Sequence, residues 1–161
     1  MGRAENLLRD MMAHVQGLIS HADSKAQINV AIASLIFSGL ALSGWGRGAL
    51  PVWARVLYFC SMGLLFASII VSLFSLTPST RSSGRNLFSF TTYAEEPLEE
   101  IIDELAEYDS DASLYKRKLV DEVKILSEIA IKKFSYIKVA VCLMLCGVFF
   151  AALFVLTSIL R

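Results

Sequence analysis

Long apolar stretches constrain this chain more than any other feature of its sequence. They occupy residues 28–45, 56–76 and 139–160, and the second and third contain no Asp, Glu, Lys or Arg over about 20 residues. A helix of about 20 residues crosses a hydrocarbon core of about 30 Å, because each residue adds 1.5 Å. A soluble fold would leave stretches of this size exposed as apolar patches. The sequence therefore predicts an all-α membrane protein with three transmembrane helices.

Charged residues are concentrated in one insert between the second and third apolar stretches. Residues 78–138 hold 21 of the 30 Asp, Glu, Lys and Arg residues. The insert carries nine basic residues, whereas the loop between the first two stretches carries only Arg47 and Arg55. Because basic segments stay in the cytoplasm, we expect the N-terminus and the insert to be cytoplasmic and the C-terminus to be external. Trp45, Trp53 and Tyr58 are then expected to be interfacial anchors on the outer side.

Helix periodicity and helix-ending residues divide the chain into six parts. Apolar residues recur at helical spacing over 4–26 without an intervening proline, which predicts an N-terminal helix that continues into the first span. Pro78 ends the second span, because a residue before proline avoids helical geometry. The expected parts are a cytoplasmic amphipathic helix at 1–26, spans at 27–45, 56–76 and 139–160, an external loop at 46–55, and a cytoplasmic helical insert at 77–138.

The insert is expected to form a helical hairpin between the second and third spans. Residues 95–111 contain nine acids and no base, and residues 114–137 are mainly basic. An acidic helix followed after a turn by a basic helix is typical of an antiparallel pair. Nothing breaks the second helix before Leu160, so it is expected to run about 70 Å and to be continuous with the last span. Such a helix can transmit a cytoplasmic event into the bilayer as a rigid rod; fast amide exchange over 132–138 would contradict this hypothesis.

Composition and motifs exclude several classes of function. The formal net charge of zero lacks the basic excess of proteins that bind nucleic acid polymers. Because the sequence shows no Gly-rich phosphate loop, activated nucleophile or paired carboxylates in an apolar setting, we expect neither catalysis nor a cofactor. No metal site is expected, since His14 and His21 are about 10 Å apart along one helix. The three cysteines lie in apolar stretches and are expected to pack as small hydrophobic residues.

Small and polar residues within the apolar stretches predict close helix packing. Small residues recur four apart, a spacing that allows helices to approach closely. These pairs are Ser34 with Ser38, Gly63 with Ala67, and Gly147 with Ala151. Asn29 either forms an interhelical hydrogen bond or lies at the membrane interface, and the sequence leaves both possibilities open. Three spans leave no room for an internal pore, so a homo-oligomer is expected.

Three segments in order along the chain resemble the Pycsar effector transmembrane family (PycTM type). Residues 21–26 (His-Ala-Asp-Ser-Lys-Ala) resemble the family's Ala-Asp-x-Lys-Ala motif at the mouth of the first span. Residues 85–90 (Arg-Asn-Leu-Phe-Ser-Phe) resemble its Asn-Leu-Phe-Phe segment, although Gly-Asp does not follow here. Residues 126–134 resemble the Leu-Ser-x-Ile…Lys-Tyr/Phe helix that enters the last span. Together these segments cover most of the chain.

The resemblance implies a bacterial antiphage effector in the inner membrane. In that family a pyrimidine cyclase makes cyclic CMP or cyclic UMP on infection. The effector responds at its cytoplasmic side and compromises the membrane, which causes abortive infection. Two other functions compete with this one: a constitutive membrane scaffold or adaptor, and a pore-forming toxin that needs no ligand.

Candidate ligand-binding residues gather at the expected cytoplasmic face of the membrane. They are Asp23, Lys25, Arg81, Arg85 and Asn86. Lys25 or an arginine can pair with the single phosphate charge of a cyclic nucleotide, and Asp23 can accept a hydrogen bond from a ribose hydroxyl or the base. The same arginines suit an anionic lipid surface. Asp23 and Lys25 can also act structurally, by holding the helix junction together.

Overall fold

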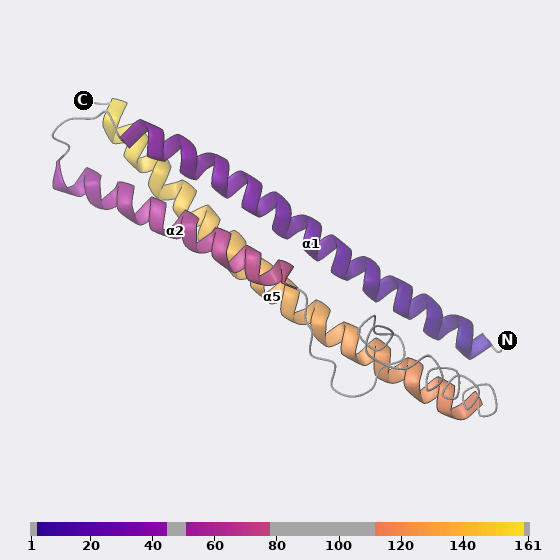
Figure 1. The fold of residues 1–161 in the computed structure, drawn as a ribbon. Coiled ribbons are helices and arrows are strands. Elements are labelled where there is room, and N and C mark those ends of the chain that lie inside the picture. The colour runs from indigo at the N-terminus through magenta and orange to yellow at the C-terminus, as the bar shows by residue number, and fades with distance from the viewer. Residues whose placement is uncertain (1–2, 45–50, 78–111, 160–161) are drawn as a thin grey trace, which may run out of the picture. The chain divides into compact units, whose positions relative to one another are not determined.

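The computed structural model describes residues 3–44, 51–77 and 112–159. This part of the chain consists of three helices, α1 (Arg3–Gly44), α2 (Val52–Leu76) and α5 (Ala112–Ile159), as Figure 1 shows. The prediction of an all-α protein is confirmed for these residues. The acidic half of the expected hairpin, 95–111, and the loop at 79–86 lie outside the described residues.

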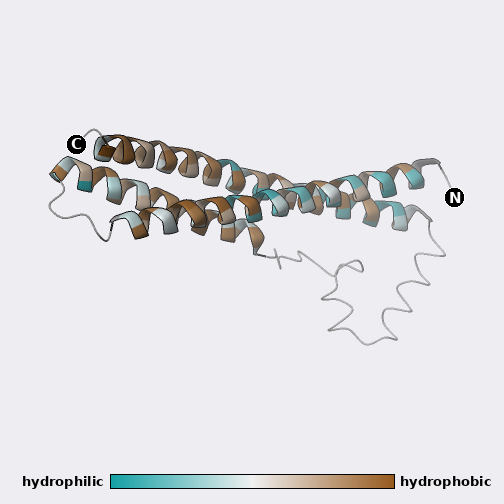
Figure 2. Ribbon diagram, turned by 90° about the horizontal axis from the view of Figure 1, so that it is seen from above, coloured by the Kyte–Doolittle hydropathy of each residue, from teal (hydrophilic) through white to brown (hydrophobic). Residues whose placement is uncertain are grey.

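All three described helices are long and apolar enough to cross a membrane. Hydrophobic residues predominate along α2 and along the C-terminal half of α5 (Figure 2). α2 follows Pro51, whose backbone is extended, and its last residue is Leu76. The prediction that the helix ends before Pro78 is therefore confirmed. At its other end α2 includes Val52 to Arg55, so the helix is longer than the charge-free stretch of 56–76.

The last helix is continuous, as the sequence predicts. α5 contains 48 residues, which corresponds to about 72 Å at 1.5 Å per residue. No break occurs over 132–138, and α1 likewise continues through 42 residues from the amphipathic segment into the first apolar stretch. Both helices exceed the roughly 20 residues that a bilayer requires.

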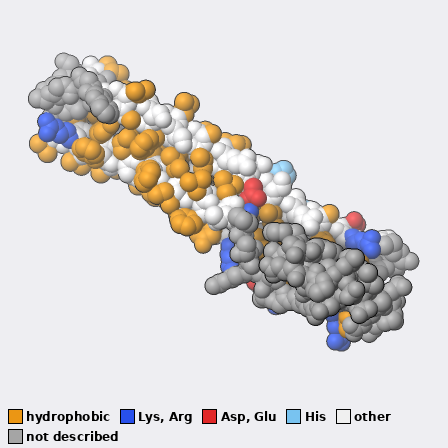
Figure 3. Space-filling view, in the orientation of Figure 1, with side chains coloured by type: hydrophobic (Ala, Val, Ile, Leu, Met, Phe, Trp, Pro, Cys, Tyr) orange, Lys and Arg blue, Asp and Glu red, His pale blue; other side chains and the backbone are white. Residues whose placement is uncertain are grey.

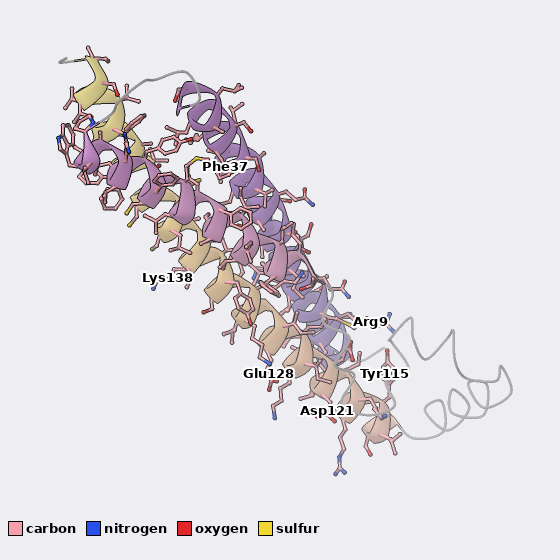
Figure 4. The ribbon with its side chains drawn as sticks, turned by 60° about the vertical axis from the view of Figure 1, so that its left-hand side comes forward. Arg9, Phe37, Tyr115, Asp121, Glu128 and Lys138 are labelled. Atoms are coloured by element: carbon pink, nitrogen blue, oxygen red, sulfur yellow. The ribbon has the colours of Figure 1, made fainter. Side chains whose placement is uncertain are left out.

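The chain divides into two compact units. The first comprises Met1–Ile19 and Pro78–Ala130, and the second comprises Ser20–Thr77 and Ile131–Arg161. Within the first unit, the guanidinium of Arg9 donates a hydrogen bond to the hydroxyl of Tyr115 at 3.2 Å (Figure 4). This contact joins the N-terminal part of α1 to the beginning of α5.

In the second unit, buried residues repeat three, four or seven positions apart on each helix, and we call this shared buried surface the seam. This spacing is the signature of coiled-coil-like packing, in which each helix keeps one stripe toward its neighbours. The α1 stripe is Ala22, Ala26, Asn29, Ala33 and Leu40; the α2 stripe is Ala54, Ser61, Leu65, Ser68, Ser72 and Ser75; the α5 stripe includes Ile137, Ala140, Gly147, Ala151 and Phe154. α2 runs antiparallel to both other helices (Figure 1).

Glycine allows α2 and α5 to approach closely at one point of the seam. A Cβ atom placed on Gly147 would lie 3.0 Å from the Leu65 side chain, whereas one placed on Gly63 would meet nothing within 4 Å. The pair Gly147 and Ala151 is buried as the prediction of close packing requires. Gly63 and Ser38 are exposed, so they do not contribute to the seam of this chain.

The outward surface of the second unit is apolar. Hydrophobic side chains gather on its visible face in Figure 3, and large exposed residues such as Leu35, Phe59 and Phe149 occur on all three helices. The three cysteines, which were expected to pack as small hydrophobic residues against lipid or another helix, are exposed on this surface. Exposed apolar side chains and a buried polar stripe are what a lipid environment favours.

Phe154 is expected to stabilise the end of the seam near the C-terminus. Its side chain is fully buried, and its ring centroid lies 5.4 Å from that of Tyr58. Phe154→Ala should lower the free energy of unfolding by about 2 kcal/mol, because a cavity forms while lipid exposure adds no further hydrophobic cost. The matched change Phe149→Ala removes an outward-facing ring and should cost less than about 0.5 kcal/mol. Denaturation by SDS in mixed micelles measures both; equal losses would contradict the packing role of Phe154.

Candidate functional site

An ion pair joins α1 and α5 at one end of the seam. Lys133 Nζ donates a hydrogen bond to Asp23 Oδ1 at 2.5 Å, and the side chains are 12% and 33% exposed, respectively. A charge-assisted bond of this kind is stronger than a neutral hydrogen bond. Because Lys133 is largely removed from solvent, its ammonium depends on Asp23 for compensation.

The helix periodicity explains why a lysine is buried here. Lys133 lies three residues after the buried Ala130 and four before the buried Ile137, so it occupies a seam position of α5. Asp23 follows the buried Ala22 on α1 and therefore lies at the edge of the α1 stripe. The seam thus directs the Lys133 side chain toward α1.

A second base lies beside this pair. Lys25 Nζ lies 5.8 Å from the centroid of the Phe134 ring, within the range of a cation–π interaction. Phe134 itself packs against a small apolar cluster built from Ala22, Ala26 and Ile137. Asp23, Lys25, Lys133 and Phe134 therefore form one group, which we call the mouth cluster, on an apolar base.

The mouth cluster has an excess of positive charge. The cluster holds two bases, Lys25 and Lys133, and one acid, Asp23, so two bases minus one acid gives one positive charge. The adjoining residues of 20–30 and 130–140 add Lys132 and Lys138 and no further acid. Lys138 projects outward from α5 (Figure 4). The ammonium group of lysine binds anions such as phosphate as a compact positive charge. Lys133 can therefore pair with the Asp23 carboxylate while Lys25 keeps a positive charge that can bind another anion.

A line of polar side chains occupies the middle of the seam. Asn29 Nδ2 donates hydrogen bonds to Ser68 Oγ at 3.0 Å and to Ser72 Oγ at 2.8 Å. Ser68 Oγ donates to the carbonyl of Ala140, and Ser61 Oγ donates to the carbonyl of Gly147. Of the two possibilities for Asn29, the interhelical hydrogen bond is confirmed. We call Asn29 with Ser61, Ser68, Ser72 and Ser75 the polar track.

The described residues include only two of the five predicted ligand-binding residues. Asp23 and Lys25 both belong to the mouth cluster, whereas Arg81, Arg85 and Asn86 lie outside the described residues. Lys133 was not among the predicted site residues, because three other lysines within nine residues (Lys124, Lys132 and Lys138) match it in chemistry. The seam serines were also missed, although their intervals of seven, four and three residues over 61–75 carry a detectable heptad pattern.

Comparison with known families places nearly the whole chain in one group. The model described as the Pycsar effector protein domain (PycTM) matches residues 7–160. The search of curated proteins and the search of solved structures gave no match. The matched region contains both segments that the pair of Asp23 and Lys133 joins.

Proposed function

Because this chain belongs to the Pycsar effector family, we propose that it senses a cyclic pyrimidine nucleotide, cyclic CMP or cyclic UMP, and then disrupts the bacterial inner membrane. The family is one of antiphage membrane effectors and is not an enzyme family. Membrane disruption after infection causes abortive infection. The N-terminus and the 77–138 insert are cytoplasmic in this proposal, so the nucleotide reaches the protein from the side on which it is made.

The contact between Asp23 and Lys133 carries the proposal. It joins the Ala-Asp-x-Lys-Ala-like segment of α1 to the Lys-Lys-Phe segment of α5, which are 110 residues apart in sequence. Two segments that resemble family motifs therefore meet in one cluster with excess positive charge. A cluster of this composition at the end of an apolar bundle suits a ligand with one negative charge.

The cyclic phosphate acts as a competitor for Lys133 in the proposed mechanism. It replaces the carboxylate of Asp23 as the partner of the ammonium, and Lys25 leaves the Phe134 ring to provide a second contact. Loss of the pair frees α1 from α5 at this end of the seam. Arg81, Arg85 and Asn86 are further proposed ligand contacts.

Nucleotide binding should depend on Lys25. Lys25→Ala is expected to weaken the binding of cyclic UMP or cyclic CMP by about 10-fold or more, because a hydrogen bond to a charged group contributes about 1.5–3 kcal/mol. Arg81→Ala and Arg85→Ala should weaken binding in the same direction. Isothermal titration calorimetry of the purified protein measures affinity, and dye release from proteoliposomes measures the response.

Arg55→Ala provides the matched control for this experiment. Arg55 is an exposed base near the opposite end of α2, so its removal should leave affinity and dye release unchanged. Cyclic AMP and cyclic GMP test specificity for pyrimidines. If neither pyrimidine nucleotide bound and dye release proceeded equally without ligand, the chain would be a ligand-independent toxin. If no dye release occurred under any condition, a scaffold role would replace the proposal.

A further inference from the structure

The polar track extends through much of the apolar part of the second unit. Ser75 lies 14 positions after Ser61 on α2, a rise of about 21 Å at 1.5 Å per residue, against a hydrocarbon core of about 30 Å. All four serines are fully or almost fully buried. Serines at helix contacts often serve only to bring helices close together, so the track requires independent evidence before it is assigned another role.

Two side-chain oxygens of the track supply that evidence. Asn29 Oδ1 and Ser75 Oγ are buried and form no hydrogen bond with any described residue. Asn29 is 3% exposed and Ser75 is 1% exposed. An unsatisfied polar atom in an apolar, lipid-surrounded interior is costly, because no bulk water can replace the missing partner.

Rotation of the Asn29 amide does not remove this deficit. The Ser68 hydroxyl already donates its proton to the Ala140 carbonyl, so toward Asn29 it can only accept. The Asn29 group that faces Ser68 and Ser72 must therefore be the NH₂ donor, as in the structure. The carbonyl oxygen is consequently turned away from both serines and needs a donor from elsewhere.

We propose that the end of the polar track at Asn29 and Ser75 binds water inside the membrane, and that the track lines the route of water and ions when the protein is activated. Ser75 lies three residues beyond Ser72, about 4.5 Å of helix rise along the same face. Asn29 Nδ2 is 2.8 Å from Ser72 Oγ. One water molecule with bonds of about 2.8 Å on each side bridges polar atoms up to about 5.6 Å apart, and in the proposed site it donates to Asn29 Oδ1 while bonding to Ser75 Oγ.

The second half of this inference rests on the proposed function. Ser61 and Ser68 donate to the carbonyls of Gly147 and Ala140, so α5 occupies their hydroxyls in this structure. Separation of α5 from α2 releases the hydroxyls of Ser61 and Ser68, and Asn29 stays bonded to α2 beside them. They then form a continuous polar surface that starts at the hydrated end of the track.

Thiol reactivity tests the water site without any nucleotide. In a background with Cys60, Cys142 and Cys146 changed to alanine, Ser75→Cys is compared with Leu73→Cys, which lies at similar depth but is 49% exposed on the apolar surface. Methyl methanethiosulfonate reacts with thiolate, which forms only where water is present. Ser75→Cys should react at least about 10-fold faster than Leu73→Cys and Ser61→Cys. Equal rates would overturn the water site; Ser72→Cys is the second reporter if Ser75→Cys does not fold.

The permeation half is tested by adding cyclic UMP or cyclic CMP to proteoliposomes. Ser68→Cys and Ser61→Cys should become at least about 10-fold more reactive, and modification by a charged methanethiosulfonate should reduce dye release, whereas Leu73→Cys should remain unaffected. If the cysteine-free parent released dye while both serine positions stayed protected, the polar track would not line the route. If the parent did not respond to nucleotide, the proposed function would fail, and the resting reactivity of Ser75→Cys would still decide the water site.

Discussion

Gly147→Leu is expected to lower the free energy of unfolding by about 3 kcal/mol or more and to prevent α5 from packing on α2. Even the first added carbon would lie 3.0 Å from Leu65 Cγ and 3.3 Å from the Leu65 backbone nitrogen. A side chain can rotate away, but backbone atoms at this distance require the helices to separate. Overpacking of a well-filled core costs about 1–3 kcal/mol for smaller changes than this one. SDS titration in mixed micelles measures the loss.

Gly63→Leu is the matched control for this prediction. Gly63 lies on the same pair of helices, but an added Cβ there meets nothing within 4 Å, and the residue is exposed. Its replacement makes the same chemical change on the outward surface and should alter the free energy of unfolding by less than about 0.5 kcal/mol. Similar losses for both glycines would show that helix flexibility, rather than close approach at Gly147, is the cause.

Lys133→Glu is expected to destabilise the mouth cluster by about 2–3 kcal/mol and to cause dye release without nucleotide. The change places a carboxylate beside Asp23 in a position where Lys133 is only 12% exposed. Breaking a fully buried pair costs about 3–5 kcal/mol, and an exposed pair contributes about 0–1 kcal/mol, so this partly buried pair lies between them. SDS titration gives the stability, and proteoliposome leakage gives the activity.

Two further variants separate the ion pair from net charge. Lys132→Glu makes the same change in net charge at the adjacent, exposed position and should cost less than about 1 kcal/mol. Asp23→Lys combined with Lys133→Glu restores opposite charges with their positions exchanged, and it should recover most of the stability. If the double variant were no more stable than Lys133→Glu alone, the contact between residues 23 and 133 would have no stabilising role.

The helices of this protein were predictable because each depends on local patterns. Charge-free stretches identified the second and third spans, Pro78 marked the end of α2, and the unbroken periodicity after residue 112 predicted the continuous α5. Asn29 could be selected as a candidate for an interhelical bond because it is an amide inside an apolar stretch. Its partners Ser68 and Ser72 could not be predicted in the same way, because serine is common in transmembrane helices. Whether a given serine is buried depends on which helix packs against it.

The mouth cluster could not be predicted, because it depends on the register between α1 and α5, which the sequence does not specify. Asp23 could pair with any of several lysines near the start of the last span, and only the packing of α1 against α5 selects Lys133. The same packing distinguishes Gly147 from Gly63, although both occur four residues before an alanine. Contacts between helices are set by small differences in rotation about each axis, and hydrophobic periodicity fixes such rotation only approximately.

The composition of the seam sets the thermodynamic scale of any switch between two conformations. Serine, alanine and glycine form most of it, and in lipid there is no hydrophobic penalty for separating helices. The four hydrogen bonds that cross it through Asn29, Ser61 and Ser68 contribute about 0.6 kcal/mol each by comparison with other membrane proteins, or about 2–3 kcal/mol together. Inverting a population from 1:99 to 99:1 requires a differential affinity of about 10⁴-fold, or about 5.5 kcal/mol. A small ligand of micromolar affinity has about 8 kcal/mol of binding free energy, so even partial discrimination between the two conformations is sufficient to reverse their populations.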